Sequence, residues 1–299
     1  MSTVIGIFFV LALTIGCQQS DKLGTKDNPI KIYFTPSVDG GVIAANSHTF
    51  IQYLEKETGL YFKTGIPTNY IAVVEAFGSK RADIGVMNSF GYIMAHEKYG
   101  ARALLRVIRY GHDFYRGQIL AHVDSGINSI ADLAGKKFAF TDPSSTSGYM
   151  FPLKILKDAK VSPGNTVFAI KHDNVVSMIY QKQVDAGATF YSPPSKDGKI
   201  RDARSRVVTQ YPDVEEKIKI IKITEKIPND PFVFRKGLDK EITRTFVAAL
   251  KKFIGTAEGK SIFENIYSVD GIVDATDADY DGLRVMIKAL DLDTTKLIK

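Results

Sequence analysis

Four hydroxyl side chains and a glycine occur together at Ser144, Ser145, Thr146, Ser147 and Gly148. Serine and threonine are preferred at helix N-caps because their oxygens accept from free N–H groups of the first turn. Those N–H groups and the positive end of the helix dipole attract anions, and glycine lets a ligand approach the backbone closely. The segment is therefore either an ordinary helix cap or a reversible oxyanion site. As an oxyanion site, it offers neutral donors and needs no obligatory cation.

The residues on either side of these hydroxyls predict a strand followed by a helix. The apolar run 137–140 is typical of a buried strand, and 153–156 begins an amphipathic helix. Pro152 suits the first helical turn, because it lacks an N–H where few donors are needed. The hydroxyls would thus lie at the C-terminal end of a strand, where open α/β sheets bind ligands.

The rest of the chain alternates strands and helices, which indicates an α/β fold. Predicted strands are 29–34, 61–65, 81–87, 102–109, 166–170, 184–190 and 217–224, and predicted helices are 50–57, 69–77, 175–181, 238–256, 261–267 and a terminal helix from 277.

Composition limits the possible functions. With 299 residues, 44% hydrophobic and 24% charged, the chain can form two lobes of ordinary size. The net charge of +6 is modest and the lysines are scattered, so nucleic acid is not an expected partner. The sequence contains no metal-ligand spacing, no phosphate-binding glycine loop and no Gly-x-Ser-x-Gly motif. We therefore expect no catalysis, no cofactor and no metal.

The N-terminal segment predicts export. The apolar run 5–16 is too short to cross a membrane but has the length of a signal-peptide core. It precedes Cys17, the single cysteine, and 13–17 resembles a bacterial lipobox, although Thr14 and the lack of a preceding Lys or Arg depart from that pattern. We expect a lipoprotein signal peptide at 1–17, lipidation at Cys17 and a tether at 18–28. The alternative is a signal peptide with an incidental cysteine.

Segment 142–149, Asp-Pro-Ser-Ser-Thr-Ser-Gly-Tyr, resembles the signature of the PhnD-like phosphonate- and phosphite-binding proteins of ABC importers. Segment 126–140 resembles the part of that family preceding the signature, and the resemblance extends over about 30–291.

This resemblance implies a two-lobed periplasmic-binding-protein fold of type II, with two hinge crossings and the ligand in the cleft between the lobes. The first lobe would be discontinuous, comprising 27–118 and 226–299. The second would comprise 119–225.

The resemblance also implies the site. The oxyanion would be held from the second lobe, and tyrosines at two helix starts would close over it from the first, together with an aspartate of the second crossing. The expected ligand-binding residues are Ser145, Thr146, Ser147, His172, Tyr70, Tyr92 and Asp230.

The residues alone leave other interpretations open for several of these positions. Tyr70 and Tyr92 could be two core tyrosines among fourteen. His172 could be an N-cap or a surface histidine, or a donor to a phosphoryl oxygen with added charge if protonated. Asp230, which lies between two prolines, could be a turn residue.

The sequence departs from the family pattern at two places. Residues 88–91 are Asn-Ser-Phe-Gly, where the family usually has Gly-Pro-Leu-Ser before the second tyrosine. The family often has an acid near Phe190 or Tyr191, and this chain has none there. We therefore expect a small ligand without a cationic tail, unless Asp230 or Glu75 supplies a counter-charge.

The expected function is substrate binding for an ABC importer of phosphonate, phosphite or a similar tetrahedral oxyanion, by hinge closure. The expected partners are a permease, an ATPase and, through a lipid anchor, the membrane at the periplasmic side. A sensor that presents ligand to a membrane histidine kinase would use the same fold. A secreted phosphoesterase using one of the serines would need a base or metal ligands that the sequence does not offer.

Overall fold

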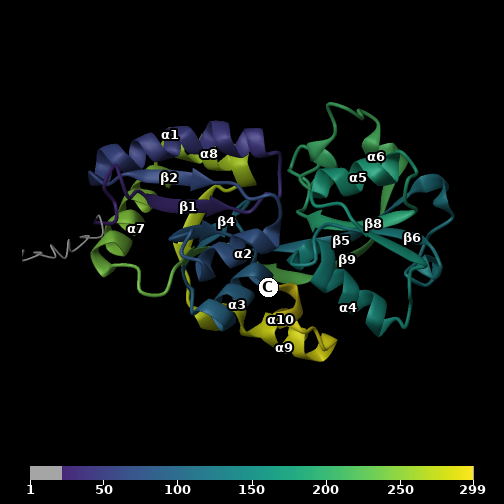
Figure 1. Ribbon diagram of the computed structural model, residues 1–299. Helices are drawn as coiled ribbons and strands as arrows, with labels where there is room; N and C mark the ends of the chain where they lie inside the picture. Colours follow the sequence, from purple (N-terminus) through teal and green to yellow (C-terminus); the bar gives the residue numbers. More distant parts are fainter. Residues whose placement is uncertain (1–21, 299) are drawn as a thin grey trace, which may run out of the picture.

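The computed structural model describes residues 22–298 and contains two α/β lobes side by side (Figure 1). Each lobe has one β-sheet with helices packed against it. The signal segment expected at 1–17, its Cys17 and the start of the tether lie outside the described residues. Within the described range, none of the helices is both long and apolar enough to cross a membrane.

The first lobe is built on a six-stranded sheet in the order β11-β4-β10-β3-β1-β2. β1 pairs in parallel with β2 and β3, whereas β10 and β11 are antiparallel to their neighbours. The strands are β1 (Ile30–Phe34), β2 (Phe62–Gly65), β3 (Ile84–Val86), β4 (Arg102–Ile108), β10 (Pro231–Phe234) and β11 (Gly271–Asp274).

Helices cover both faces of this sheet (Figure 1). Along β10, Phe232 and Phe234 join the apolar cluster under α1, α7 and α8, while Val233 joins the cluster under α2, α3 and α9. This alternation follows from the two-residue period of a strand. The helices are α1 (Gly40–Thr58), α2 (Tyr70–Gly78), α3 (Ser89–Tyr99), α7 (Lys240–Ile254), α8 (Ala257–Tyr267), α9 (Asp281–Leu290) and α10 (Thr294–Leu297).

The second lobe has a five-stranded sheet in the order β7-β6-β8-β5-β9. β6 is parallel to β7 and β8, and β5 is antiparallel to β8 and β9. Its strands and main helices are β5 (Phe114–His122), β6 (Lys137–Phe140), α4 (Phe151–Asp158), β7 (Asn165–Phe168), α5 (His172–Tyr180), β8 (Ala186–Tyr191), α6 (Val214–Lys217) and β9 (Ile218–Pro228).

The two crossings between the lobes lie elsewhere than the expected boundaries. The first crossing is 109–113, between β4 and β5, and the second is Asn229 and Asp230, between β9 and β10. The boundaries expected after 118 and after 225 fall inside β5 and β9. These strands pair along their whole length in the second sheet. An alternating sequence predicts a strand but not the sheet that the strand joins.

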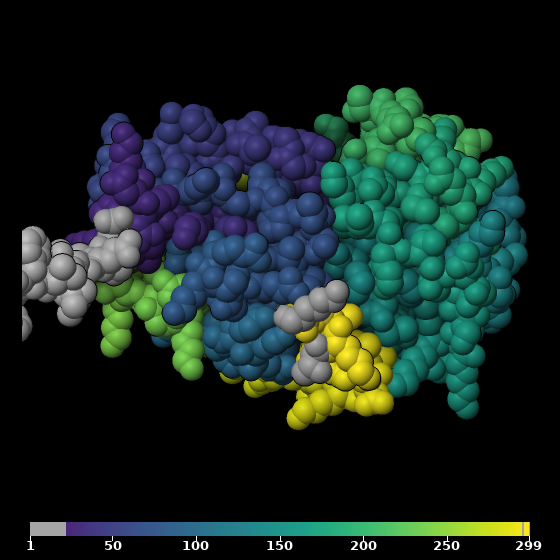
Figure 2. Space-filling model, in the orientation of Figure 1, coloured from purple at the N-terminus to yellow at the C-terminus, as the bar shows by residue number. Residues whose placement is uncertain are grey.

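The C-terminal helix α9 contacts both lobes. Met286 and Ile287 share an apolar cluster with α3 of the first lobe and with Phe151 of the second. Lys157 Nζ, on α4, donates to the main-chain oxygen of Leu290 at 3.1 Å. Figure 2 shows the C-terminal segment, in yellow, against the teal second lobe. Helix α9 therefore packs on the first lobe as expected, and it also contacts the second lobe.

Candidate functional site

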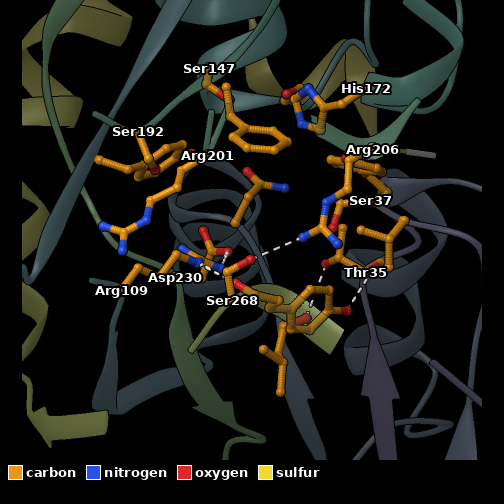
Figure 3. Close-up of a pocket in the computed structure, with 18 of the residues that line it drawn as sticks. Thr35, Ser37, Arg109, Ser147, His172, Ser192, Arg201, Arg206, Asp230 and Ser268 are labelled. Carbon is orange, nitrogen blue, oxygen red and sulfur yellow. Dashed lines mark hydrogen bonds and ion pairs between the residues drawn. The ribbon is translucent and has the colours of Figure 1, made fainter. Parts of the chain in front are cut away.

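A cavity of about 70 Å³ lies between the two lobes and the crossings (Figure 3). The cavity is therefore large enough for a small ligand. The polar and charged side chains that line it are Thr35, Ser37, Tyr70, Asn88, Arg109, Tyr110, Tyr115, Ser145, Ser147, His172, Ser192, Arg201, Arg206, Asp230, Tyr267 and Ser268.

The hydroxyl-rich segment forms a single wide turn before α4 begins. Thr146–Met150 is a π-helical turn, in which Met150 N–H donates to the oxygen of Ser145 at 3.0 Å. Ser145 caps this turn, because its Oγ accepts from Gly148 N–H at 3.0 Å. Pro152 lies in the first turn of α4, as the sequence predicts. Single π turns are frequent at functional sites.

The four hydroxyls of this turn have different surroundings. Ser145 and Ser147 line the cavity. Ser144 Oγ instead donates to Asp142 at 2.7 Å within the turn. Thr146 does not reach the cavity, because its Oγ1 donates to Asn88 Oδ1 at 3.0 Å and accepts from Phe90 N–H at 2.9 Å. Thr146 thus joins the second lobe to the start of α3 in the first.

Gly148 is required by packing rather than by ligand approach. A Cβ atom at this position would lie 2.2 Å from Thr141 Oγ1 and 2.5 Å from Thr141 Cβ. Gly148 is also absent from the cavity wall. The turn therefore packs closely against the end of β6, and the role expected for Gly148 from the sequence is replaced by a structural one.

His172 begins α5 and lines the cavity, with its side chain buried. Burial, helped by the charges of Arg206 and Arg109, lowers the pKa of His172 to about 3, so the ring is neutral near pH 7. Its Nδ1 lies 3.1 Å from Thr141 Oγ1, which donates to the oxygen of Ala188 at 3.1 Å. When Thr141 gives its one hydroxyl hydrogen to Ala188, Nδ1 carries the proton of the ring and Nε2 is an acceptor; in the other tautomer these roles are exchanged.

Tyr70 is the first residue of α2 and lies at the cavity with 2% of its surface exposed. Among the described residues, its hydroxyl has no hydrogen-bond partner. Burial and the nearby Asp142 raise the pKa of this phenol well above its ordinary value, so it remains a donor. A buried hydroxyl without a partner is costly, so this group favours an acceptor in the cavity.

Tyr92 does not lie at the cavity. It is fully buried on α3, with its ring 4.8 Å from that of Tyr280, and its hydroxyl donates to Asp277 Oδ1 at 2.6 Å. Tyr92 is the fourth residue after the cap Asn88, so it is three residues farther from the helix start than Tyr70 is in α2. Asn88 lines the cavity in its place. The helix starts where the sequence suggests, but the tyrosine faces the core.

The two crossings meet in an ion pair at the cavity. Arg109 donates to Asp230 Oδ2 at 2.6 Å, to Asn229 Oδ1 at 3.2 Å and to the oxygen of Tyr267 at 2.8 Å. Burial by itself lowers the pKa of Arg109, but the Asp230 carboxylate holds this pKa above its ordinary value. Asp230 Oδ1 is buried and has no partner among the described residues. Asp230 thus lies at the cavity, with its charge compensated by Arg109.

Two further arginines line the cavity, and the sequence analysis did not single them out. Arg201 stacks on the ring of Tyr110 at 4.3 Å, and Arg206 donates to Ser268 Oγ at 3.1 Å. Both belong to the long connection between β8 and β9. The signal available was three arginines within six residues, but Arg204 instead pairs with Asp202 inside the lobe. The spacing of these arginines in the sequence does not tell which side chains point into the cavity and which point into the lobe.

The site therefore combines hydroxyl and phenol donors with guanidinium groups around a small cavity. Phe190 closes part of the wall and packs edge-on against the His172 ring at 5.1 Å. No group of three or more His, Cys, Asp and Glu side chains in residues 22–298 is arranged to hold a metal ion. This donor set suits a polyatomic oxyanion, which accepts several hydrogen bonds at once.

Comparison with known proteins defines the class of this fold and site. Residues 32–280 match the family of phosphonate periplasmic substrate-binding proteins of ABC transporters. The chain belongs to this family. As a member, it is the periplasmic substrate-binding component of an ABC transporter.

The chain is also similar to individual proteins, in sequence or in fold. The chain is 26% identical to the phosphate-import protein PhnD of Mycolicibacterium smegmatis, over 92% of this chain and 91% of the relative. A binding-protein component of an ABC phosphonate transporter from Pseudomonas aeruginosa has a similar structure, with a TM-score of 0.76, 19% identity and coverage of 90% and 96% of the two chains. PhnD1 of Prochlorococcus marinus, solved with methylphosphonate, gives a TM-score of 0.75, 18% identity and coverage of 88% and 98%.

Proposed function

We propose that this chain binds a phosphonate, phosphite or similar tetrahedral oxyanion between its lobes and delivers it to an ABC permease. The observation that carries the proposal is the buried, unpartnered hydroxyl of Tyr70 at the same small cavity as Ser145 and Ser147. These are donors from opposite lobes, so a single oxyanion between them would satisfy both. Each hydrogen bond to a charged partner contributes about 1.5–3 kcal/mol.

The remaining cavity groups complete this proposed arrangement. Asp230 Oδ1 is a buried acceptor, and the neutral His172 ring offers Nε2 as a second acceptor when Nδ1 carries its proton. A hydroxyl on a protonated ligand oxygen can donate to either. Arg109 orients Asp230 and keeps its charge compensated.

Binding is coupled to closure of the lobes in this proposal. Tyr70 N–H donates to Asp142 Oδ2 across the lobes at 3.4 Å, and Lys171 Nζ lies 3.6 Å from Asp39 Oδ2. The hydrogen bond from Thr146 to Asn88 is a third contact between the lobes. Figure 2 shows the two lobes in contact along their facing sides. Release to the permease would require these bonds to break, and a rotation about the two crossings is the simplest motion that does so.

We further propose that the protein is held at the membrane by a lipid on Cys17, which lies outside the described residues. The apolar core before Gly16 and Cys17 supports this. Cys17→Ser should release the protein from the membrane fraction. Unchanged membrane association of that variant would contradict lipidation without affecting the binding proposal.

Calorimetry of a double variant tests the binding site. Ser145→Ala combined with Ser147→Ala removes two donors, so the affinity for methylphosphonate or phosphite should fall by at least about 100-fold. Ser144→Ala is the matched control, because its hydroxyl faces Asp142 rather than the cavity. A loss below about threefold in the double variant would refute this site.

A further inference from the structure

The side chains that line the cavity carry more positive than negative charge. Arg109 and Asp230 compensate each other, and the cavity imidazole is neutral. In residues 22–298, Arg201 and Arg206 line the cavity without a carboxylate in ion-pair contact. The field of Asp173 reaches Arg206 from farther away. The cavity wall thus carries two positive charges that no protein anion compensates directly.

These two arginines lie apart from the serine turn. Figure 3 shows Arg201 and Arg206 on opposite sides of the cavity, with Ser147 and His172 beyond them in the upper part of the view. Arg206 comes from the second lobe and donates to Ser268 of the first, so its guanidinium group bridges the two lobes beside the cavity. The serine turn and the two arginines can therefore hold two different parts of one ligand.

Phosphonoformate is a phosphonate with one adjoining carboxylate. A guanidinium group matches a carboxylate in both charge and bidentate geometry.

Resting on the function proposed above, we propose that the cavity selects phosphonates whose substituent carries a second negative charge, with the phosphoryl group at Ser145 and Ser147, the carboxylate at Arg206, and the positive charge of Arg201 facing it across the cavity. A ligand with an ammonium group would bring a like charge to the same arginines. Asp230 Oδ1 can accept from such a group, but the charge of Asp230 is already compensated by Arg109, so it offsets the repulsion only in part.

Calorimetry at one pH and one salt concentration tests this selectivity with three ligands. Phosphonoformate should bind at least about tenfold more tightly than methylphosphonate, and 2-aminoethylphosphonate should bind more weakly than both. Equal affinities for phosphonoformate and methylphosphonate, or a preference for 2-aminoethylphosphonate, would overturn the inference while leaving the proposed function intact. If none of the three ligands binds, and phosphite and phosphate also fail, the proposed function falls and the inference with it.

Variants assign the selectivity to the arginines. Arg206→Gln should weaken the binding of phosphonoformate at least about tenfold and the binding of methylphosphonate less than about threefold. Arg201→Gln should act in the same direction and serves as a second variant at an independent position. Arg244→Gln is the matched control, because it makes the same change in net charge on an exposed helix surface. An equal loss for both ligands in the two cavity variants would assign the arginines to the phosphoryl group and overturn the inference.

Discussion

The starts of α2 and α3 resemble each other in sequence but differ in what they contribute to the cavity. Each helix is capped by an asparagine: Asn69 Oδ1 accepts from Ala72 N–H and Asn88 Oδ1 from Gly91 N–H, both at 2.9 Å. Each also carries a tyrosine in its first turns. Tyr70 presents an unpartnered hydroxyl to the cavity, whereas the Tyr92 hydroxyl is already bonded to Asp277.

The difference follows from the distance between cap and tyrosine. Tyr70 comes directly after its cap and therefore lies at the helix end, where the lobes meet. Tyr92 comes three residues later, about 4.5 Å farther along its helix, and packs on Tyr280. In α3 the cap itself reaches the cavity and also bonds to Thr146. A shared local motif thus supplies a ligand donor in one helix and a bond between the lobes in the other.

The largest expected difference is in ligand binding. Tyr70→Phe should weaken oxyanion binding by roughly 10- to 100-fold, because a donor to a charged partner is lost. Tyr92→Phe should change the same affinity by less than about threefold. Calorimetry with methylphosphonate compares the two variants, and similar losses in both would show that the two tyrosines are not functionally different.

The two caps should differ in stability. Asn69→Ala should lower the free energy of unfolding by about 1 kcal/mol, as expected for loss of an N-cap. Asn88→Ala should cost about 2 kcal/mol, because the bond from Thr146 is lost as well. Denaturant unfolding measures both, and in a Thr146→Val background Asn88→Ala should cost only about 1 kcal/mol, because the bond to Thr146 is already absent. Equal costs would mean that the bond between the lobes adds no stability.

A smaller effect is expected for the tyrosines in the absence of ligand. Tyr92→Phe should lower the free energy of unfolding by about 1 kcal/mol, because Asp277 loses a hydrogen bond in a partly exposed setting. Tyr70→Phe should leave stability unchanged or slightly raised, since it removes a buried hydroxyl without a partner. Thermal unfolding of the ligand-free proteins provides the measurement, and a Tyr70→Phe variant less stable than Tyr92→Phe would contradict it.

The smallest expected effect is in acid. Burial raises the pKa of Asp277, but hydrogen bonds from Tyr92 and Arg284 outweigh it and hold this pKa below its ordinary value. A carboxylate with a lowered folded pKa contributes stability above its unfolded pKa of about 3.9, and that contribution is lost as the pH falls through the folded pKa. The difference in stability between wild type and Tyr92→Phe should therefore be constant above about pH 5 and shrink as the pH falls below about 4. A difference in the free energy of unfolding that stays the same below about pH 4 would exclude Asp277 as the cause of that difference.

Local sequence was sufficient for the elements and for part of the site. The apolar, β-favouring residues of 29–34 predict β1, and the hydroxyls before Pro152 predict a turn that leads into α4; the structure contains both. Ser145, Ser147 and Tyr70 lie at the cavity because each is fixed by a short-range feature: Ser145 is a cap, Ser147 lies in the turn that it caps, and Tyr70 is a first helical residue. Local hydrogen bonds decide these positions, and local sequence encodes them.

Only the tertiary structure decided which lobe a strand joins and which way a long side chain points. β5 and β9 belong to the second sheet because they pair with each other along their length, and alternation is the same for either sheet. Arg206 reaches the cavity while Arg204, two residues earlier, pairs inside the lobe with Asp202, and both arginines look alike in sequence. Tyr92 turned toward Tyr280 and Asp277 because residues almost two hundred positions away pack against α3. Contacts between distant segments depend on how the whole chain packs, and the periodicity of a single segment does not record them.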